Sequence, residues 1–227
     1  MFELDVRGLL SVQDRCRSRE GLIIKDFMEG GADMENPYSD ILDIKPSDCT
    51  PAQESLKKAL IQLLSGNKLQ DISIKELCLY SFTARSTFYA YYNNIDEILE
   101  DVENDMIFKL AGLNRKLMDN HVKYKEDMGF YSETISLIED NKPVFYTLLI
   151  ANPDQRFIDK WKRAMKYHFW ERIKPSGRMK NTELILEITA SAAVGAYSFW
   201  LTHPYEVDVG DAYRILSGVL KTIDEIG

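Results

Sequence analysis

Apolar residues recur at the spacing of amphipathic helices along most of this 227-residue chain. In the run Leu56–Leu64, leucine and alanine residues repeat at intervals of three and four, which places them on one face of a helix. Thr50 and Gln53 have the spacing of a capping box, and Pro51 suits the first helical position. Gly66 is expected to end this helix.

Two shorter helices are expected next. Ser73 and Glu76 have the spacing of a second capping box, and the helix that they open is expected to bury Leu77 and Cys78. Thr83 is expected to cap the helix that follows. At 100° per residue, that helix has an inward face and a polar, aromatic outward face. The inward residues are predicted to be Ala84, Phe88, Tyr91 and Tyr92, and the outward residues Arg85, Ser86, Tyr89 and Asn93.

The rest of the chain is also predicted to be helical from its periodicity. A Gly- and Pro-rich loop is expected after the helix predicted over residues 9–28. The predicted helices cover residues 9–28, 96–121, 131–140 and 143–151, a helix with Phe157, Ile158, Trp161, Met165, His168 and Phe169 on one face that ends at residues 175–177, and two last helices capped by Thr182 and Asp208.

Charge divides the chain into three parts. Residues 1–49 hold 11 acidic and 6 basic residues, residues 50–95 hold 3 and 5, and residues 96–227 hold 22 and 17. Because the whole chain has a net charge of -8, a site for a polyanion must be a local basic patch. The middle part contains the lysines for one, namely Lys57, Lys58, Lys68 and Lys75.

Two short helices joined by a tight turn, with a polar face on the second, have the layout of a helix-turn-helix, whose second helix enters the major groove of DNA. Arg85 suits a bidentate pair with guanine, and Ser86 and Thr87 suit base edges or a thymine methyl group. Tyr89 suits a phosphate. The alternative is that the tyrosines form the core and rim of a small helical packing unit, and periodicity alone does not decide between the two.

The motif SIKELC, followed six residues later by RSTFYAYYNNIDEIL, resembles the DNA-binding domain of TetR-family transcriptional regulators. In that family a helix-turn-helix runs into a long helix with an N-x-x-E-like cap, here Asn94 to Glu97. Three later segments resemble the ligand domain and closing helices of one TetR subgroup: FYTLLIANPDQRFIDKWKRAMKYHFWERI, LILEITASAAVGAYSFWLTHP and AYRILSGVL.

The resemblance implies an all-α fold with a helix-turn-helix domain over residues 50–95 and a helical effector-binding and dimerisation domain over 96–227. Residues 1–49, which are net acidic, precede this part as an N-terminal extension. It implies a homodimeric, cytoplasmic regulator, with repression as the expected sign, that binds operator DNA under control of an unidentified small-molecule effector. No cofactor is expected.

Three sets of site residues are expected. The candidates for binding DNA are Ser73, Lys75, Arg85, Ser86, Thr87, Tyr89, Tyr91 and Asn93. The candidates for an effector pocket, which are more often plain core, are Phe108, Phe145, Tyr146, Trp161, Met165, His168, Phe169, Tyr197 and Trp200. The last two helices are implied to pair with their copies in a second subunit, through Ser191, Ala192, Gly195, Ala196, Tyr213, Leu216 and Leu220.

Three positions depart from the family pattern: Phe82 replaces a turn glycine, Ala84 a serine cap and Asn93 a lysine. Because a turn with positive φ favours glycine, Phe82 predicts an altered turn. Losing the cap costs about 1 kcal/mol unless Thr83 replaces it. These departures motivate the alternative of a regulator-like adaptor that binds protein and has lost specific DNA binding.

The acidic extension is longer than the family norm, and Met34 is a candidate later start. One hypothesis is that the extension lowers operator affinity by covering the basic patch or by repelling phosphates. The other, which we favour, is that a helix over residues 9–28 packs on the ligand domain, because its apolar residues need burial.

Other classes of protein find little support in the sequence. His121, His168 and His203 are far apart, and neither a metal motif nor a nucleophile elbow occurs, so neither catalysis nor a metal is expected. The run Ile188–Tyr205 contains polar residues and Pro204, which favours a buried helix over a membrane span. Three widely spaced cysteines without a disulfide-framework pattern, and an acidic N-terminus without a long apolar run, indicate the cytosol.

Overall fold

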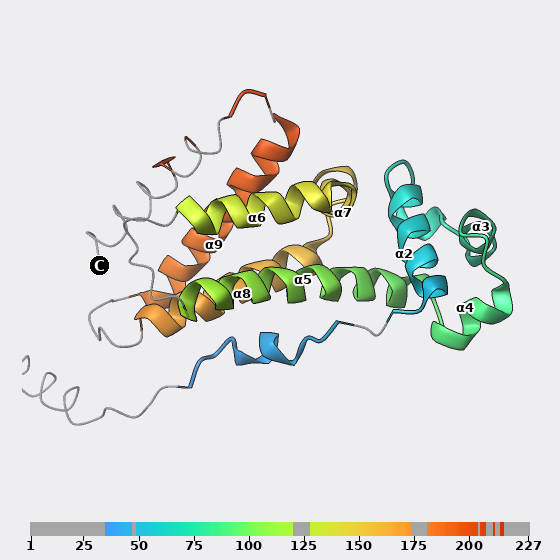
Figure 1. The fold of residues 1–227 in the computed structure, drawn as a ribbon, viewed down its shortest axis with the longest axis horizontal. Helices are drawn as coiled ribbons and strands as arrows, with labels where there is room; N and C mark the ends of the chain where they lie inside the picture. Colours follow the sequence, from blue (N-terminus) through green and yellow to red (C-terminus); the bar gives the residue numbers. More distant parts are fainter. Residues whose placement is uncertain are drawn as a thin grey trace, which may run out of the picture. The chain divides into compact units, whose positions relative to one another are not determined.

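The computed structural model describes residues 35–46, 49–119, 128–173, 181–203, 205–207, 211, 214 and 215, and all regular elements among them are helical (Figure 1). The predicted all-α class is therefore confirmed. The predicted helix over residues 9–28, Met34, and the predicted cap Asp208 lie outside the described residues. The helices are α2 (Pro51–Leu64), α3 (Ile74–Tyr80), α4 (Arg85–Tyr91), α5 (Ile95–Asp119), α6 (Met128–Asp140), α7 (Lys142–Tyr146), α8 (Gln155–Ile173) and α9 (Thr182–Thr202), with 3-10 turns η2 (Ser39–Asp43) and η3 (Leu69–Asp71) and a π-helical turn η4 (Thr147–Ala151).

Helix α2 begins and ends where the sequence predicts. The Gln53 N–H donates to Thr50 Oγ1 at 3.3 Å, and the Thr50 N–H donates to Gln53 Oε1 at 3.1 Å, which completes the capping box. The apolar face of α2, with Leu56 and Leu60 fully buried, packs against α3, α4 and α5. The helix ends at Leu64, directly before Ser65 and Gly66.

The longer helices form a second layer of packing (Figure 1), in which α5 packs against both α6 and α8, and α8 also packs against α9. An aromatic cluster fills the centre of this layer. The rings of Phe145 and Trp161 lie 5.5 Å apart, and Trp161 stacks on Tyr197 at 5.4 Å. Helix α9 is long and apolar enough to cross a membrane by length and composition, yet eight of its residues, among them Leu186 and Trp200, are buried in this fold.

Some helix boundaries differ from the prediction, and α6 begins at Met128 rather than at residue 131. The helix expected over residues 143–151 is α7 followed by the π-helical turn η4. Thr182 was expected to cap α9, but Asn181 occupies the N-cap position in a left-handed conformation, with φ 61°, and Thr182 is the first helical residue. An asparagine tolerates that conformation better than most residues do.

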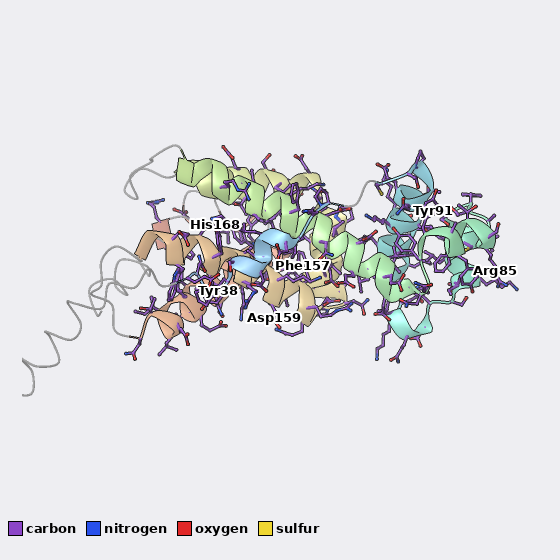
Figure 2. The ribbon with its side chains drawn as sticks, turned by 90° about the horizontal axis from the view of Figure 1, so that it is seen from below. Tyr38, Arg85, Tyr91, Phe157, Asp159 and His168 are labelled. Atoms are coloured by element: carbon purple, nitrogen blue, oxygen red, sulfur yellow. The ribbon has the colours of Figure 1, made fainter. Side chains whose placement is uncertain are left out.

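The segment Asn36–Ile44, here called the N-terminal strap, packs on α8, and Figure 2 shows its Tyr38 against that helix. The Asn36 side chain donates to the Tyr167 carbonyl at 3.0 Å, and Asp40 forms an ion pair with Arg163 at 2.6 Å. Ile41 is buried. This described part of the acidic extension is therefore fixed to α8.

Candidate nucleic-acid interface

The turn between α3 and α4 has the two hydrogen bonds of a Schellman motif. The Thr83 N–H donates to the Cys78 carbonyl at 2.9 Å, and the Phe82 N–H donates to the Leu79 carbonyl at 3.3 Å. Phe82 occupies the position that usually holds glycine, with φ 52°. The prediction of an altered turn is therefore wrong. The turn keeps its form because Phe82 adopts a left-handed conformation that costs an L-residue about 1–2 kcal/mol.

Helix α4 begins without a side-chain cap. Its N-cap residue, Ala84, has φ -67° and ψ 145°, a conformation suited to capping, but a methyl group accepts no hydrogen bond. The Thr83 hydroxyl donates to the Ser81 carbonyl at 3.3 Å, so it is not the cap either. The prediction that Thr83 caps α4 is therefore wrong.

The outward surface of α4 is polar and aromatic. Phe88 and Tyr92 are buried, as predicted, and Figure 2 shows Arg85 projecting away from the body of the structure. Tyr91 and Ala84 were predicted to face inward, but both are exposed. Tyr91 is the last residue of α4. The backbone becomes extended at Tyr92, and this change directs the Tyr92 side chain, but not that of Tyr91, into the core. The exposed residues of α4 include Arg85, Ser86, Tyr89 and Tyr91, while Thr87 is half-buried.

The other predicted DNA-binding residues differ in whether their polar groups already form hydrogen bonds or ion pairs within the protein. Lys75 is exposed on the first turn of α3 and has no ion pair among the described residues. Ser73 Oγ accepts the Glu76 N–H at 3.1 Å and so caps α3. Asn93 donates its backbone N–H to Glu97 at 2.8 Å and its side-chain amide at 3.0 Å. Both bonds lower the pKa of Glu97, and the bond from the backbone contributes most. Asn93 therefore mainly stabilises the start of α5.

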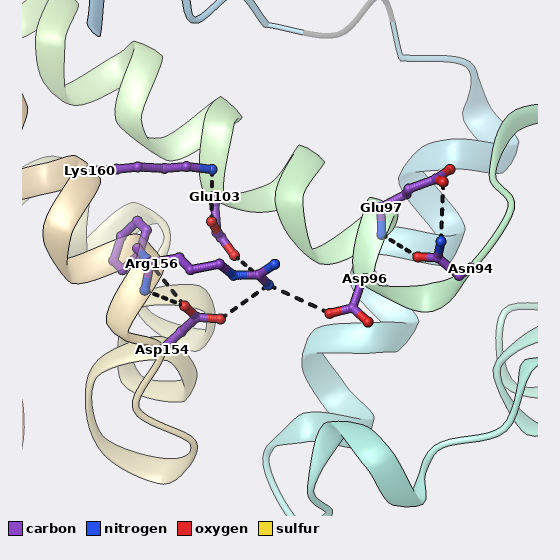
Figure 3. A network of polar contacts seen from close by, with 8 residues as sticks. Asn94, Asp96, Glu97, Glu103, Asp154, Arg156 and Lys160 are labelled. Carbon is purple, nitrogen blue, oxygen red and sulfur yellow. Dashed lines mark hydrogen bonds and ion pairs between the residues drawn. The ribbon is translucent and has the colours of Figure 1, made fainter.

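The predicted Asn94 cap of α5 is present, since the Glu97 N–H donates to Asn94 Oδ1 at 3.0 Å (Figure 3). It directs the chain from the end of α4 into the long helix α5. The Asn94–Glu97 spacing read from the sequence therefore identified the junction between α4 and α5.

Lys57 does not belong to the basic surface. Its side chain is buried, with Nζ 2.8 Å from Asp105 and 3.5 Å from Asp101. The Tyr92 hydroxyl donates to Asp101 at 2.8 Å, and burial together with this bond raises the pKa of Tyr92. This network joins α2, the end of α4 and α5. The periodicity of α2 could have predicted that Lys57 is buried, because Lys57 lies one helical turn before the buried Leu60 and Ile61.

Three exposed lysines remain near the helix-turn-helix after Lys57 is removed. Lys58 lies 3.6 Å from Glu54. Lys68 and Lys75 have no ion pair among the described residues, and the same holds for Arg85 on α4. The local positive charge therefore comes from a smaller set than the sequence suggested.

A second polar network, which the sequence did not reveal, joins the start of α5 to α8 (Figure 3). Glu103 of α5 is fully buried, 2.9 Å from Lys160 and 3.2 Å from Arg156. Arg156 also lies 3.7 Å from Asp96 in the first turn of α5. Burial raises the pKa of Glu103, and the hydrogen bond from Lys160 opposes that rise. Asp154 Oδ1 accepts the Arg156 N–H at 2.8 Å at the start of α8.

Asn152 makes a further direct link from the second helical layer to α2. Its side-chain amide donates to the Leu64 carbonyl and, at 2.9 Å, to the Asn67 carbonyl, at the C-terminal end of α2. The sequence run Asn152-Pro153-Asp154 is typical of a turn and helix start, but the distant partners of Asn152 have no signature in it.

The candidate pocket residues do not all lie together: Phe145, Trp161 and Tyr197 pack against one another in the aromatic cluster, whereas others lie elsewhere. Phe108 and Tyr146 are on the surface, 45% and 41% exposed, and Phe169 is half-buried. His168 is buried, and its Nε2 atom has no hydrogen-bond partner among the described residues. Burial, with a smaller contribution from Arg115, lowers the pKa of His168 to about 4. The other candidates are buried, namely Phe145, Trp161, Met165, Tyr197 and Trp200.

Helix α9 has an exposed apolar side. Leu184, Ile188 and Phe199 are 59%, 46% and 52% exposed. Gly195 lies on the same side, and a Cβ atom built there would meet nothing within 4 Å. Of the other predicted interface residues, Ser191, Ala192 and Ala196 are half-buried, whereas Tyr213, Leu216 and Leu220 lie outside the described residues.

Comparison with known proteins agrees with a helix-turn-helix protein. No protein-family model matches the chain. The chain is 27% identical over 113 residues to the uncharacterized HTH-type transcriptional regulator YxbF of Bacillus subtilis, a match that covers 47% of this chain and 28% of that protein. The chain therefore spans less than a third of the length of this relative.

Two solved structures are similar over most of the chain. The first is a TetR transcriptional regulator from Streptococcus agalactiae, with 17% identity, a TM-score of 0.59 and coverage of 74% of this chain and 93% of that one. The second is a putative TetR-family transcriptional regulator from Syntrophomonas wolfei, with 14% identity, a TM-score of 0.62 and coverage of 76% and 94%. The chain therefore has the fold of the TetR-family transcriptional regulators.

Proposed function

We propose that this protein is a cytoplasmic, non-enzymatic TetR-type transcriptional regulator that binds operator DNA as a homodimer under control of a small-molecule effector, with repression as the expected sign. The observation that carries the proposal is the surface of α4. Arg85, Ser86 and Tyr89 are exposed on this helix, above a fully buried Phe88. A helix that displays donors and a cation outward, and is anchored by one aromatic residue inward, is suited to the major groove.

The chemistry of these side chains suits both parts of DNA recognition. A guanidinium reads guanine O6 and N7, whereas a phenol hydroxyl donates to phosphate. Arg85 has no ion pair among the described residues, so no internal bond must break before it binds. Lys68 and Lys75 add charge that attracts phosphates without reading sequence.

The homodimer is supported by the exposed side of α9. A stripe with Leu184, Ile188 and Phe199 around Gly195 is apolar and open to close approach. A second copy of α9 would cover it and place two α4 helices for successive major grooves. Sedimentation at micromolar concentration tests this part, and a monomer there would contradict it.

Effector control is supported by two features of the second helical layer. The buried His168 has an unpaired Nε2 atom, which suits a polar group on an otherwise apolar effector. Asn152 and Arg156 bond that layer to the end of α2 and the start of α5. An effector that favours another arrangement of these contacts would shift the spacing of the two α4 helices.

Selection from random DNA sequences, followed by gel shift, tests operator binding. Arg85→Ala should weaken binding to the selected site by about 1–3 kcal/mol and should relax the sequence preference at one base position. The matched control, Lys75→Ala, should weaken all sequences alike, because a phosphate contact carries no sequence information. Unchanged affinity and preference in Arg85→Ala would show that the docking is wrong.

The second candidate function is a protein-binding adaptor that lacks specific DNA binding. It is favoured by the uncapped start of α4 and by the exposed apolar residues Leu79 and Tyr80 on α3, 75% and 51% exposed. The same selection separates the two functions. Failure to enrich any sequence at low salt, with folded protein, would favour the adaptor.

A further inference from the structure

Phe82, in the turn between α3 and α4, combines two unfavourable features. Its φ is 52°, and its side chain is 99% exposed. Glycine would take the same backbone conformation without a steric cost. Because the ring is almost entirely in solvent, packing within the described protein does not offset that cost. Strained backbone conformations of this kind cluster at binding and active sites.

The surroundings of Phe82 indicate which partner would cover it. It lies three residues before Arg85 and in the same helix-turn-helix as Lys75, two exposed cations without an ion pair among the described residues. The segment 50–95 that contains it holds 5 basic and 3 acidic residues, whereas both flanking segments are net acidic. This charge favours an anionic partner, and the operator binding proposed above makes that partner DNA.

We infer that Phe82 is a base-reading residue whose ring packs against the C5-methyl group of a thymine in the major groove, next to the base pair that Arg85 reads. The inference rests on the operator binding proposed above. A phenyl ring has no hydrogen-bonding atom, and the thymine methyl group is the apolar feature that a base edge presents in the major groove. Contact with it would bury the ring on binding.

The left-handed backbone has a direct role in this contact. The bonds from Phe82 to Leu79 and from Thr83 to Cys78 fix the backbone of the turn, so the side chain leaves the turn toward solvent before DNA arrives. A backbone that is already ordered loses less entropy on binding than a flexible loop does.

The test replaces single thymines by uracil, which lacks only the C5-methyl group, in the site obtained by selection. With the wild-type protein, uracil at one position of a half-site should weaken binding about fourfold, the value for one buried methyl group. Phe82→Gly should bind the thymine site about fourfold more weakly and should lose all sensitivity to uracil at that position. Phe82→Asn, which tolerates the left-handed conformation without glycine's flexibility, should behave in the same way.

Leu79→Ala is the matched control, because Leu79 is a neighbouring exposed apolar residue that belongs to helix α3. It should keep the uracil sensitivity of the wild type. Equal affinity of wild type and Phe82→Gly, or a uracil response that survives in Phe82→Gly, would overturn the inference. If the wild type enriches no DNA sequence at all, the proposed function itself fails, and that result is distinct from either outcome.

Discussion

At the scale of single residues, the left-handed conformation of Phe82 is predicted to lower the free energy of unfolding. Phe82→Gly should raise the free energy of unfolding by about 0.5–1 kcal/mol, because relief of left-handed strain exceeds the entropy that glycine adds to the unfolded chain. Chemical denaturation measures this. Phe82→Ala is the control, since alanine keeps the strained backbone, and an equal gain in both variants would contradict the explanation.

The residues that the sequence predicted correctly are those whose roles depend on near neighbours. The Thr50 capping box and the inward position of Phe88 follow from spacing alone. The conformation of Phe82 does not, because two backbone bonds impose it against the preference of the residue. Lys57 was misjudged because its partners, Asp101 and Asp105, belong to a helix distant in sequence.

At the scale of elements, the start of α4 is predicted to be improvable. Ala84 already has the backbone conformation of an N-cap and lacks only an acceptor. Ala84→Ser should therefore raise the free energy of unfolding by about 0.5–2 kcal/mol, as its hydroxyl accepts an N–H of the first turn. Thermal unfolding measures this, with Ala84→Val as the control that adds bulk without a good cap. No gain over Ala84→Val would contradict the assignment of the cap.

The packing of α8 is predicted to depend on pH through His168. Its pKa is lowered to about 4 from 6.5, so the unfolded chain takes up the proton at a higher pH than the folded one. Stability is fully present above pH 6.5 and is lost as pH falls toward 4, by about 3 kcal/mol at most. His168→Gln, which stays neutral, should flatten this part of a stability-against-pH curve measured by denaturation. Curves of equal slope would show that His168 is not buried as described.

Elements were predictable to the extent that they are periodic and capped locally. The bounds of α2 and α3 follow from their capping residues and apolar spacing. The π-helical turn η4 and the attachment of Asn152 to the end of α2 were not predictable, because they depend on how the second helical layer meets the first. The candidate interface on α4 was found from sequence, whereas the network around Glu103 required the packed helices.

At the scale of the whole molecule, the acidic extension divides into parts with different expected roles. The N-terminal strap is fixed to α8 by Asp40, Asn36 and the buried Ile41. Residues 1–33 hold seven acidic and five basic residues, and residues 34–49 hold four and one. Much of the negative charge therefore lies in the part that contains the strap, where the Asp40 carboxylate is already paired with Arg163.

Two deletions separate a structural role from an inhibitory one. Deleting residues 1–33 keeps the strap. Because we favour a helix over residues 9–28 that packs on the ligand domain, we expect this deletion to lower the free energy of unfolding and to leave operator affinity unchanged. Deleting residues 1–45 removes the burial of Ile41 and the pair with Arg163, and should lower the free energy of unfolding by about 2–4 kcal/mol. Operator affinity of the three proteins should be compared across a salt series, because repulsion between the extension and phosphates acts furthest at low salt. Tighter binding by either shortened protein at low salt, fading as salt rises, would show that the extension inhibits DNA binding. Equal affinity of the three proteins, with lower stability after deletion of residues 1–45 than after deletion of residues 1–33, would establish the strap as part of the fold around α8.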